Sequence, residues 1–103
     1  MRSGPARRDV KSNEIIFRYR RVSGDEFKET AVFNLGSGGL SVRISETIES
    51  GEEVEFELLI GTAKVVRGKG LVAWSATNED RHGLCFIDLD EHAQKIVELW
   101  LAA

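Results

Sequence analysis

The sequence has one cysteine and one proline among its 103 residues. With Cys85 alone, the chain cannot form an internal disulfide, and a metal site built from paired cysteines is excluded. No apolar run approaches the roughly 20 residues of a membrane-spanning helix, and the first residues are basic and polar rather than signal-like. We therefore expect one cytoplasmic domain that does not insert into a membrane.

Charge is distributed unevenly along the chain, although the formal net charge is only -3. The first 21 residues carry seven basic and two acidic side chains, whereas the remainder carries seven basic and fifteen acidic ones. This split indicates a local basic face on an otherwise acidic molecule. A small anion fits such a face better than a long nucleic-acid duplex, which most of the surface would repel.

Apolar residues alternate with polar ones through the middle of the chain, a pattern that predicts short strands. The expected strands are residues 14–20, 27–33, 40–44, 53–60, 63–74 (with a bulge at 67–70) and 83–87. The alternation is clearest at 53–60. We expect an all-β domain with one C-terminal helix, built as a small six-stranded antiparallel β-barrel, because closure removes exposed edges from short strands.

The two ends of the chain differ from this middle. Residues 1–13 lack apolar periodicity and are expected to form a flexible basic arm before a single domain of residues 14–103. At the other end, helical periodicity predicts a helix over about 89–102, with Asp88 as its cap and Glu91 three residues on. Trp100 lies on the apolar stripe of this helix, which favours a packing role over ligand stacking.

The sequence gives little support for catalysis. His82 and His92 have no nucleophile beside them in sequence, and His82 with Cys85 supplies only two of the ligands that a zinc site needs. We expect Cys85 to be buried and His82 to be exposed, because a free cysteine is usually buried. The sequence therefore predicts a non-catalytic protein with no metal site and no cofactor.

A glycine-rich turn, residues 33–40, separates two of the expected strands. Its glycines allow backbone angles that other residues resist and leave main-chain amides exposed. The turn lacks the Gly-Lys-Ser/Thr ending of a P-loop and leads into a strand, which argues against nucleoside triphosphate binding. From these residues alone, the turn is either an ordinary hairpin or half of a ligand site, and the basic arm either solubilises the chain or binds an anion.

Four short motifs follow one another along the chain. The arm reads Arg-Arg-Asp-Val-Lys over residues 7–11 and the turn reads Asn-Leu-Gly-Ser-Gly-Gly over residues 34–39. Two further motifs lie in later strands, Gly-Leu-Val-Ala-Trp from residue 70 and Gly-Leu-Cys-Phe from residue 83. Together these motifs resemble the PilZ domain, a family of bacterial receptors for the second messenger cyclic di-GMP, over nearly the whole chain.

The resemblance implies that cyclic di-GMP is the ligand, held between the arm and the turn. It implies Arg7 and Arg8 as the main contacts, because a guanidinium can stack on a guanine, pair with its edge or bind a phosphate. The arm would become ordered around the ligand. The further contacts that the resemblance implies are Lys11, Asn34, Gly36, Ser37 and Gly39.

The chain departs from the family pattern at two positions. Lys11 stands where an arginine is expected, Gly36 stands where a serine is expected, and Ser37 comes one place late. Two losses of about 1 kcal/mol each would weaken binding roughly tenfold to a hundredfold. The alternative interpretation is a degenerate PilZ domain that does not bind the dinucleotide and acts through a protein partner.

A barrel that binds single-stranded nucleic acid is a third interpretation. It requires exposed aromatic side chains interleaved with basic ones. Phe17 and Tyr19 are close in sequence to Arg18 and Arg20, but strand alternation places the aromatic pair on the opposite face. We therefore expect no nucleic-acid partner.

Overall fold

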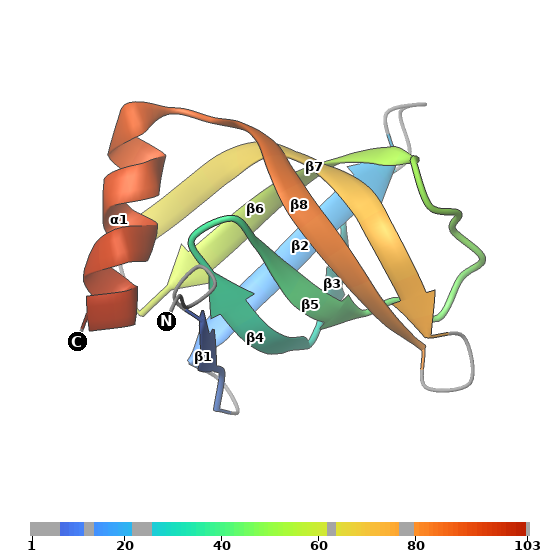
Figure 1. Cartoon of the computed structure of the whole chain (residues 1–103), viewed down its shortest axis with the longest axis horizontal. Helices are drawn as coiled ribbons and strands as arrows, with labels where there is room; N and C mark the ends of the chain where they lie inside the picture. Colours follow the sequence, from blue (N-terminus) through green and yellow to red (C-terminus); the bar gives the residue numbers. More distant parts are fainter. Residues whose placement is uncertain (1–6, 12–13, 22–25, 62–63, 77–79, 103) are drawn as a thin grey trace, which may run out of the picture.

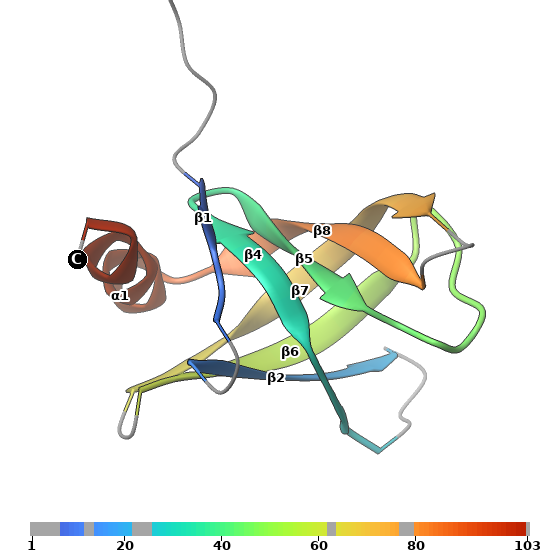
Figure 2. The same ribbon diagram turned by 90° about the horizontal axis from the view of Figure 1, so that it is seen from below.

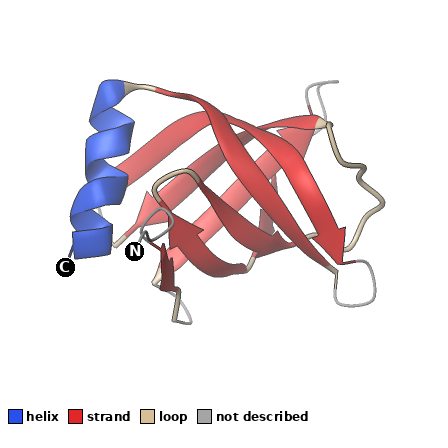
Figure 3. Ribbon diagram, in the orientation of Figure 1, coloured by secondary structure: helices blue, strands red, loops and turns tan. Residues whose placement is uncertain are grey.

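The computed structural model describes residues 7–11, 14–21, 26–61, 64–76 and 80–102. Eight strands and one helix make up this part of the chain (Figure 1 and Figure 3). In chain order they are β1 (Arg7–Asp9), β2 (Ile15–Arg21), β3 (Lys28–Thr30), β4 (Val32–Gly36), β5 (Gly39–Arg43), β6 (Glu53–Ile60), β7 (Lys64–Ala76), β8 (Arg81–Leu89) and α1 (Glu91–Ala102).

The strands form one antiparallel sheet in the order β1-β4-β5-β8-β7-β6-β2-β3. The sheet curls strongly, and α1 lies at one end of it (Figure 1). Only Ala31 separates β3 from β4, although these strands lie near opposite ends of the sheet. The curl therefore brings the two ends of the sheet toward each other, and the architecture is a half-barrel.

The prediction of a closed six-stranded barrel is wrong in two respects. The expected strand 27–33 is interrupted at Ala31, and Val32 rather than its neighbours turns toward the core. Residues 7–9, from the expected flexible arm, pair with β4 (Figure 2). The sequence could not reveal either feature. The connection between β3 and β4 is a single residue, and β1 is a charged strand of three residues, so neither shows apolar alternation.

The core lies between the inward faces of the curled sheet. The β2 and β6 strands pair along seven positions, and their Phe17 and Phe56 rings are buried with centroids 6.0 Å apart. The predicted alternation of β6 is confirmed, because every second residue from Val54 to Ile60 is buried. Burying apolar side chains of this size stabilises a fold by about 1.5–3 kcal/mol each.

Helix α1 begins two residues later than the sequence predicts. The carboxylate of Asp90 accepts a hydrogen bond from the Ala93 amide at 2.7 Å, so Asp90 is the N-terminal cap. The prediction of Asp88 as the cap is wrong because β8 continues through Leu89. In the described part of the chain, no helix has both the length and the apolar character needed to cross a membrane.

Strand β8 reverses the predicted exposure of its histidine and cysteine. His82 and Leu84 point inward and are 4% and 3% exposed, whereas Cys85 is exposed. Alternation along the strand decides this, because residues two apart share a face and Leu84 occupies the core. The general tendency of free cysteine to be buried is overridden by the register of one strand.

A polar network holds the loop after β5 against β2. The Tyr19 hydroxyl donates a hydrogen bond to the Glu46 carboxylate, and Lys28 Nζ lies 3.0 Å from the same group. Arg21 bridges the loop through Glu52, with Nε 2.8 Å from its carboxylate. Burial and the Glu46 carboxylate raise the pKa of Tyr19, which stays a hydrogen-bond donor, and the Tyr19 bond lowers the pKa of Glu46.

Replacing Glu46 by glutamine is expected to lower the free energy of unfolding by about 1 kcal/mol at pH 7, since hydrogen bonds to a charged carboxylate are lost. A carboxylate with a lowered folded-state pKa stabilises the fold above its unfolded-state pKa, and this contribution disappears as the pH falls through the folded-state pKa. Thermal unfolding of the wild type and of Glu46→Gln should therefore differ at pH 7 and converge only as the pH falls through the lowered pKa of Glu46.

The exposed Glu49 in the same loop provides the control. Glu49→Gln should change the free energy of unfolding at pH 7 by less than about 0.5 kcal/mol, as is usual for an exposed side chain. An equal response of the two variants would show that Glu46 gains nothing from its contacts with Tyr19 and Lys28.

Candidate functional site

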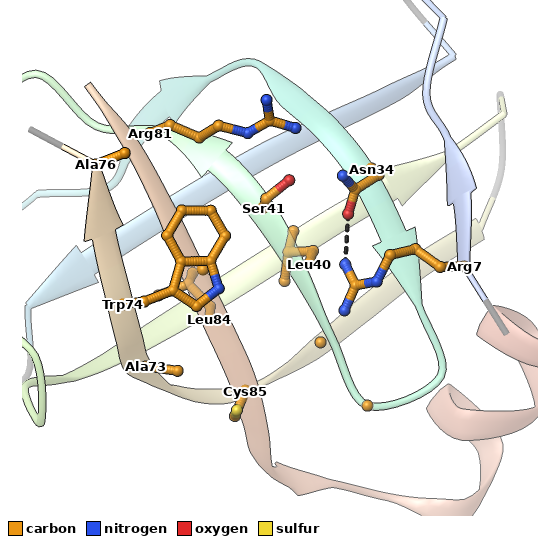
Figure 4. Close-up of a pocket in the computed structure, with 13 residues that line it drawn as sticks. Arg7, Asn34, Leu40, Ser41, Ala73, Trp74, Ala76, Arg81, Leu84 and Cys85 are labelled. Atoms are coloured by element: carbon orange, nitrogen blue, oxygen red, sulfur yellow. Dashed lines mark hydrogen bonds between the residues drawn. The ribbon is translucent and has the colours of Figure 1, made fainter. Parts of the chain in front are cut away.

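A pocket of about 570 Å³ lies beside the turn between β4 and β5 (Figure 4). Five strands contribute to it. Their principal side chains are Arg7 from β1, Asn34 from β4, Ser41 from β5, Trp74 from β7 and Arg81 from β8. The volume lies within the range of small-molecule sites, and the lining combines an aromatic wall with hydrogen-bonding groups.

Arg7 and Asn34 meet at one side of the pocket. The β1 strand runs antiparallel to β4 with Arg7 opposite Gly36, so Arg7 lies on the same face as Asn34, two residues away. The Arg7 guanidinium donates a hydrogen bond to Asn34 Oδ1 (Figure 4). Two residues that the sequence predicts for the site, 27 positions apart, are thus brought into contact.

Trp74 forms the opposite side of the pocket and is 46% exposed. A register shift against β8 falls between Val72 and Trp74, so β7 carries an extra residue there. Such a bulge re-aims the following side chain. The indole consequently lies over Gly83, where an added Cβ would come within 2.1 Å of the indole Nε1.

Gly39 allows the turn to approach β8 closely. A Cβ at this position would lie 2.1 Å from the Leu84 carbonyl oxygen, whereas one at Gly38 would meet no atom within 4 Å. Both glycines line the pocket. The requirement for glycine at position 39 therefore comes from strand packing, whether or not a ligand is present.

Arg8 lies on the other face of β1, away from the pocket. It is opposite the buried Leu35, and its guanidinium carbon lies 4.3 Å from the centroid of the Trp100 ring. Arg8 Nη1 also donates to the Trp100 carbonyl oxygen at 2.6 Å, and Nη2 lies 3.5 Å from Glu14. In this structure Arg8 therefore joins the arm to the C-terminal helix.

The other residues of the predicted site do not line the pocket. The Lys11 amide donates to Glu14 Oε1 at 3.1 Å, and Lys11 borders a separate pocket of about 350 Å³. Gly36 is buried opposite Arg7 in the strand pair, and Ser37 is half-buried in the bend that follows. Of the seven predicted residues, the structure brings Arg7, Asn34 and Gly39 together at the pocket.

Sequence reasoning did not place Trp74, Arg81 or Ser41 in the site. The sequence predicts that the last strand begins at residue 83, but β8 already begins at Arg81, whose guanidinium carbon lies 4.4 Å from the Phe33 ring centroid. Among the described residues, Arg81 Nε and Ser41 Oγ are buried without a hydrogen-bond partner. The only sequence signal was Trp74 itself, which marks one of the short motifs.

The remaining arginines of β2 are engaged with carboxylates of neighbouring strands. Arg20 Nε lies 2.6 Å from Glu55, and Arg18 Nε lies 3.5 Å from Glu29. Each such surface pair contributes little to stability, but pairing reduces the positive charge that this face presents. On the same face the guanidinium carbon of Arg20 lies 4.7 Å from the centroid of the exposed Phe27 ring.

The half-barrel with its terminal helix defines a small, mostly β domain with a polar, aromatic-walled pocket beside one turn. The family model described as the PilZ domain matches residues 9–103, and the chain belongs to this family. The resemblance inferred from the four motifs is thereby confirmed. A comparison with curated proteins finds no matching sequence.

Two bacterial proteins are among the solved structures that share the fold. The Bacillus subtilis inhibitor of motility, MotI/DgrA, superposes with a TM-score of 0.77 at 14% sequence identity over 99% of this chain. This chain spans 50% of the length of MotI/DgrA. The PilZ domain of YcgR from Escherichia coli, whose structure contains c-di-GMP, gives a TM-score of 0.76 at 12% identity, covering 99% of this chain and 90% of that one.

Proposed function

We propose that this chain is a non-catalytic receptor module that binds cyclic di-GMP in the pocket between Arg7 and Trp74. The observation that carries the proposal is the meeting of Arg7 and Asn34, from two separate motifs, at a pocket whose far wall is an exposed indole. Membership of the PilZ family and the fold shared with the c-di-GMP-containing YcgR domain support this choice of ligand.

The chemistry of the lining suits a guanine dinucleotide. The Trp74 face offers a stacking platform for a base, and such stacking is worth about 1–3 kcal/mol. Arg7 and Arg81 supply planar donor groups that match a phosphate or the O6/N7 edge of guanine. Asn34 can both donate and accept, and Gly39 leaves the main chain of the turn open to the ligand.

Four residues of the predicted site do not contact the ligand in the pocket in this proposal: Arg8, Lys11, Gly36 and Ser37. Arg8 positions β1 through its contact with Trp100, and Lys11 adds positive charge at the end of the arm. Gly36 and Ser37 shape the turn without offering a side-chain contact inside the pocket. The affinity is accordingly expected in the micromolar range, since two of the family's polar groups are replaced.

Isothermal titration calorimetry of the whole chain with cyclic di-GMP tests the proposal. At about 100 µM protein, saturable heat is expected for cyclic di-GMP, and GMP at the same concentration serves as the control for stacking of a single base. A folded sample that gives no heat with cyclic di-GMP would overturn the proposal. The chain would then be a degenerate domain that works through a protein partner.

A further inference from the structure

Ser41 is a buried hydroxyl group without a hydrogen-bond partner in the described part of the chain. It lies in the middle of β5 and is 2% exposed. A hydroxyl taken out of water without a partner lowers the stability of a fold, so most buried hydroxyls are satisfied by protein or by water. Because no group in the described part of the chain pairs with the Ser41 hydroxyl, its hydrogen-bond partner is to be sought outside the chain.

The position of Ser41 points to such a partner, because the residue lines the pocket. In the sheet it is directly opposite Asn34 on one side and Gly83 on the other. Side chains of opposed residues share a face and lie about 5 Å apart. Gly83 has no side chain, and the Trp74 indole occupies the space over it. Figure 4 shows Ser41 between Asn34, Trp74 and Arg81, on the floor of the pocket.

We propose that Ser41 is a ligand-binding residue, and that its hydroxyl bonds the edge of the guanine that stacks on Trp74. This inference rests on the proposed function. The turn has glycine at position 36 and places Ser37 outside the pocket, so neither position supplies a hydroxyl to the ligand. Ser41 supplies one from the next strand, and a hydroxyl both donates and accepts, which suits either polar edge of guanine.

The substitution Ser41→Ala separates a ligand contact from a structural role. It removes an unpartnered hydroxyl, so the free protein should melt about 2–5 °C higher than the wild type. The same change should weaken cyclic di-GMP binding about fivefold, because one neutral hydrogen bond to the ligand is lost. Higher stability combined with lower affinity is the expected signature. Melting is followed by circular dichroism, and affinity by calorimetry on the whole chain.

Ser37→Ala is the matched control, since it makes the same chemical change in the adjoining turn but outside the pocket. It should alter neither the melting temperature nor the affinity. Unchanged affinity in Ser41→Ala, with a wild type that binds, would overturn the role of Ser41 alone. A lower melting temperature would overturn it as well, because the hydroxyl would then have a partner in the fold. A wild type that does not bind cyclic di-GMP would overturn the proposed function and, with it, this inference.

Discussion

Substitution of Gly39 by alanine is expected to lower the free energy of unfolding by about 3 kcal/mol, near the upper end for overpacking a tight contact. The new Cβ would lie 2.1 Å from the Leu84 oxygen and 3.1 Å from the Leu84 carbonyl carbon. These are main-chain atoms of β8, so they cannot rotate away as a side chain would. The strands would have to separate where Gly39 is paired with Cys85. Urea denaturation of the purified variant measures the loss.

Gly38→Ala is the control for this prediction, because the neighbouring glycine has open space around the added methyl group. We expect its free energy of unfolding to stay within about 0.5 kcal/mol of the wild type. If the two variants were equally stable, the approach of β5 to β8 would be looser than the structure has it. The pair also shows why Gly39 by itself does not distinguish a receptor from a degenerate domain: the fold needs it in both.

Replacing Arg7 by alanine is expected to weaken cyclic di-GMP binding roughly tenfold to a hundredfold while leaving thermal stability nearly unchanged. Its guanidinium is exposed and faces the pocket, where hydrogen bonds to a charged ligand are worth about 1.5–3 kcal/mol. The measurement is calorimetry with cyclic di-GMP beside a melting curve for each protein.

Arg8→Ala is the comparison, since it removes an identical side chain from the adjacent position. We expect this variant to lose about 1–2 kcal/mol of stability, through the lost contacts with Trp100 and Glu14, and to keep its affinity within about threefold. Equal losses of affinity in the two variants would contradict this division of roles. Arg8 would then leave Trp100 when the ligand binds.

The parts of the fold that the sequence predicts are those with a strong local pattern. Strand β6 and helix α1 each bury one face against the core, so their periods of 2 and 3.6 residues are visible in the order of the residues. Strands β1 and β3 have three residues each and are mostly exposed. They form because β4 and β2 offer main-chain hydrogen bonds to them. These partner strands are distant in sequence, so the residues of β1 and β3 themselves give no signal.

The residues of the candidate site likewise fall into those that the sequence identifies and those that only the strand register places. Arg7 and Asn34 are identified through short motifs, and the structure brings them together. Trp74 and Ser41 depend on how β7 and β5 are aligned with β8, and a one-residue bulge decides the alignment at Trp74. A shift of one residue would turn either side chain to the other face of the sheet. Sequence alternation alone therefore could not place them.

The contact between Arg8 and Trp100 makes tryptophan fluorescence informative in this protein. The chain has two tryptophans, and they lie at the two places that β1 connects: Trp74 in the pocket and Trp100 against Arg8. Indole fluorescence depends on the charges and solvent around the ring, so the two residues report on different neighbourhoods. In Trp74→Phe the remaining emission comes from the helix, and in Trp100→Phe it comes from the pocket. The protein thus carries two tryptophan probes, one in the pocket that Arg7 lines and one against Arg8.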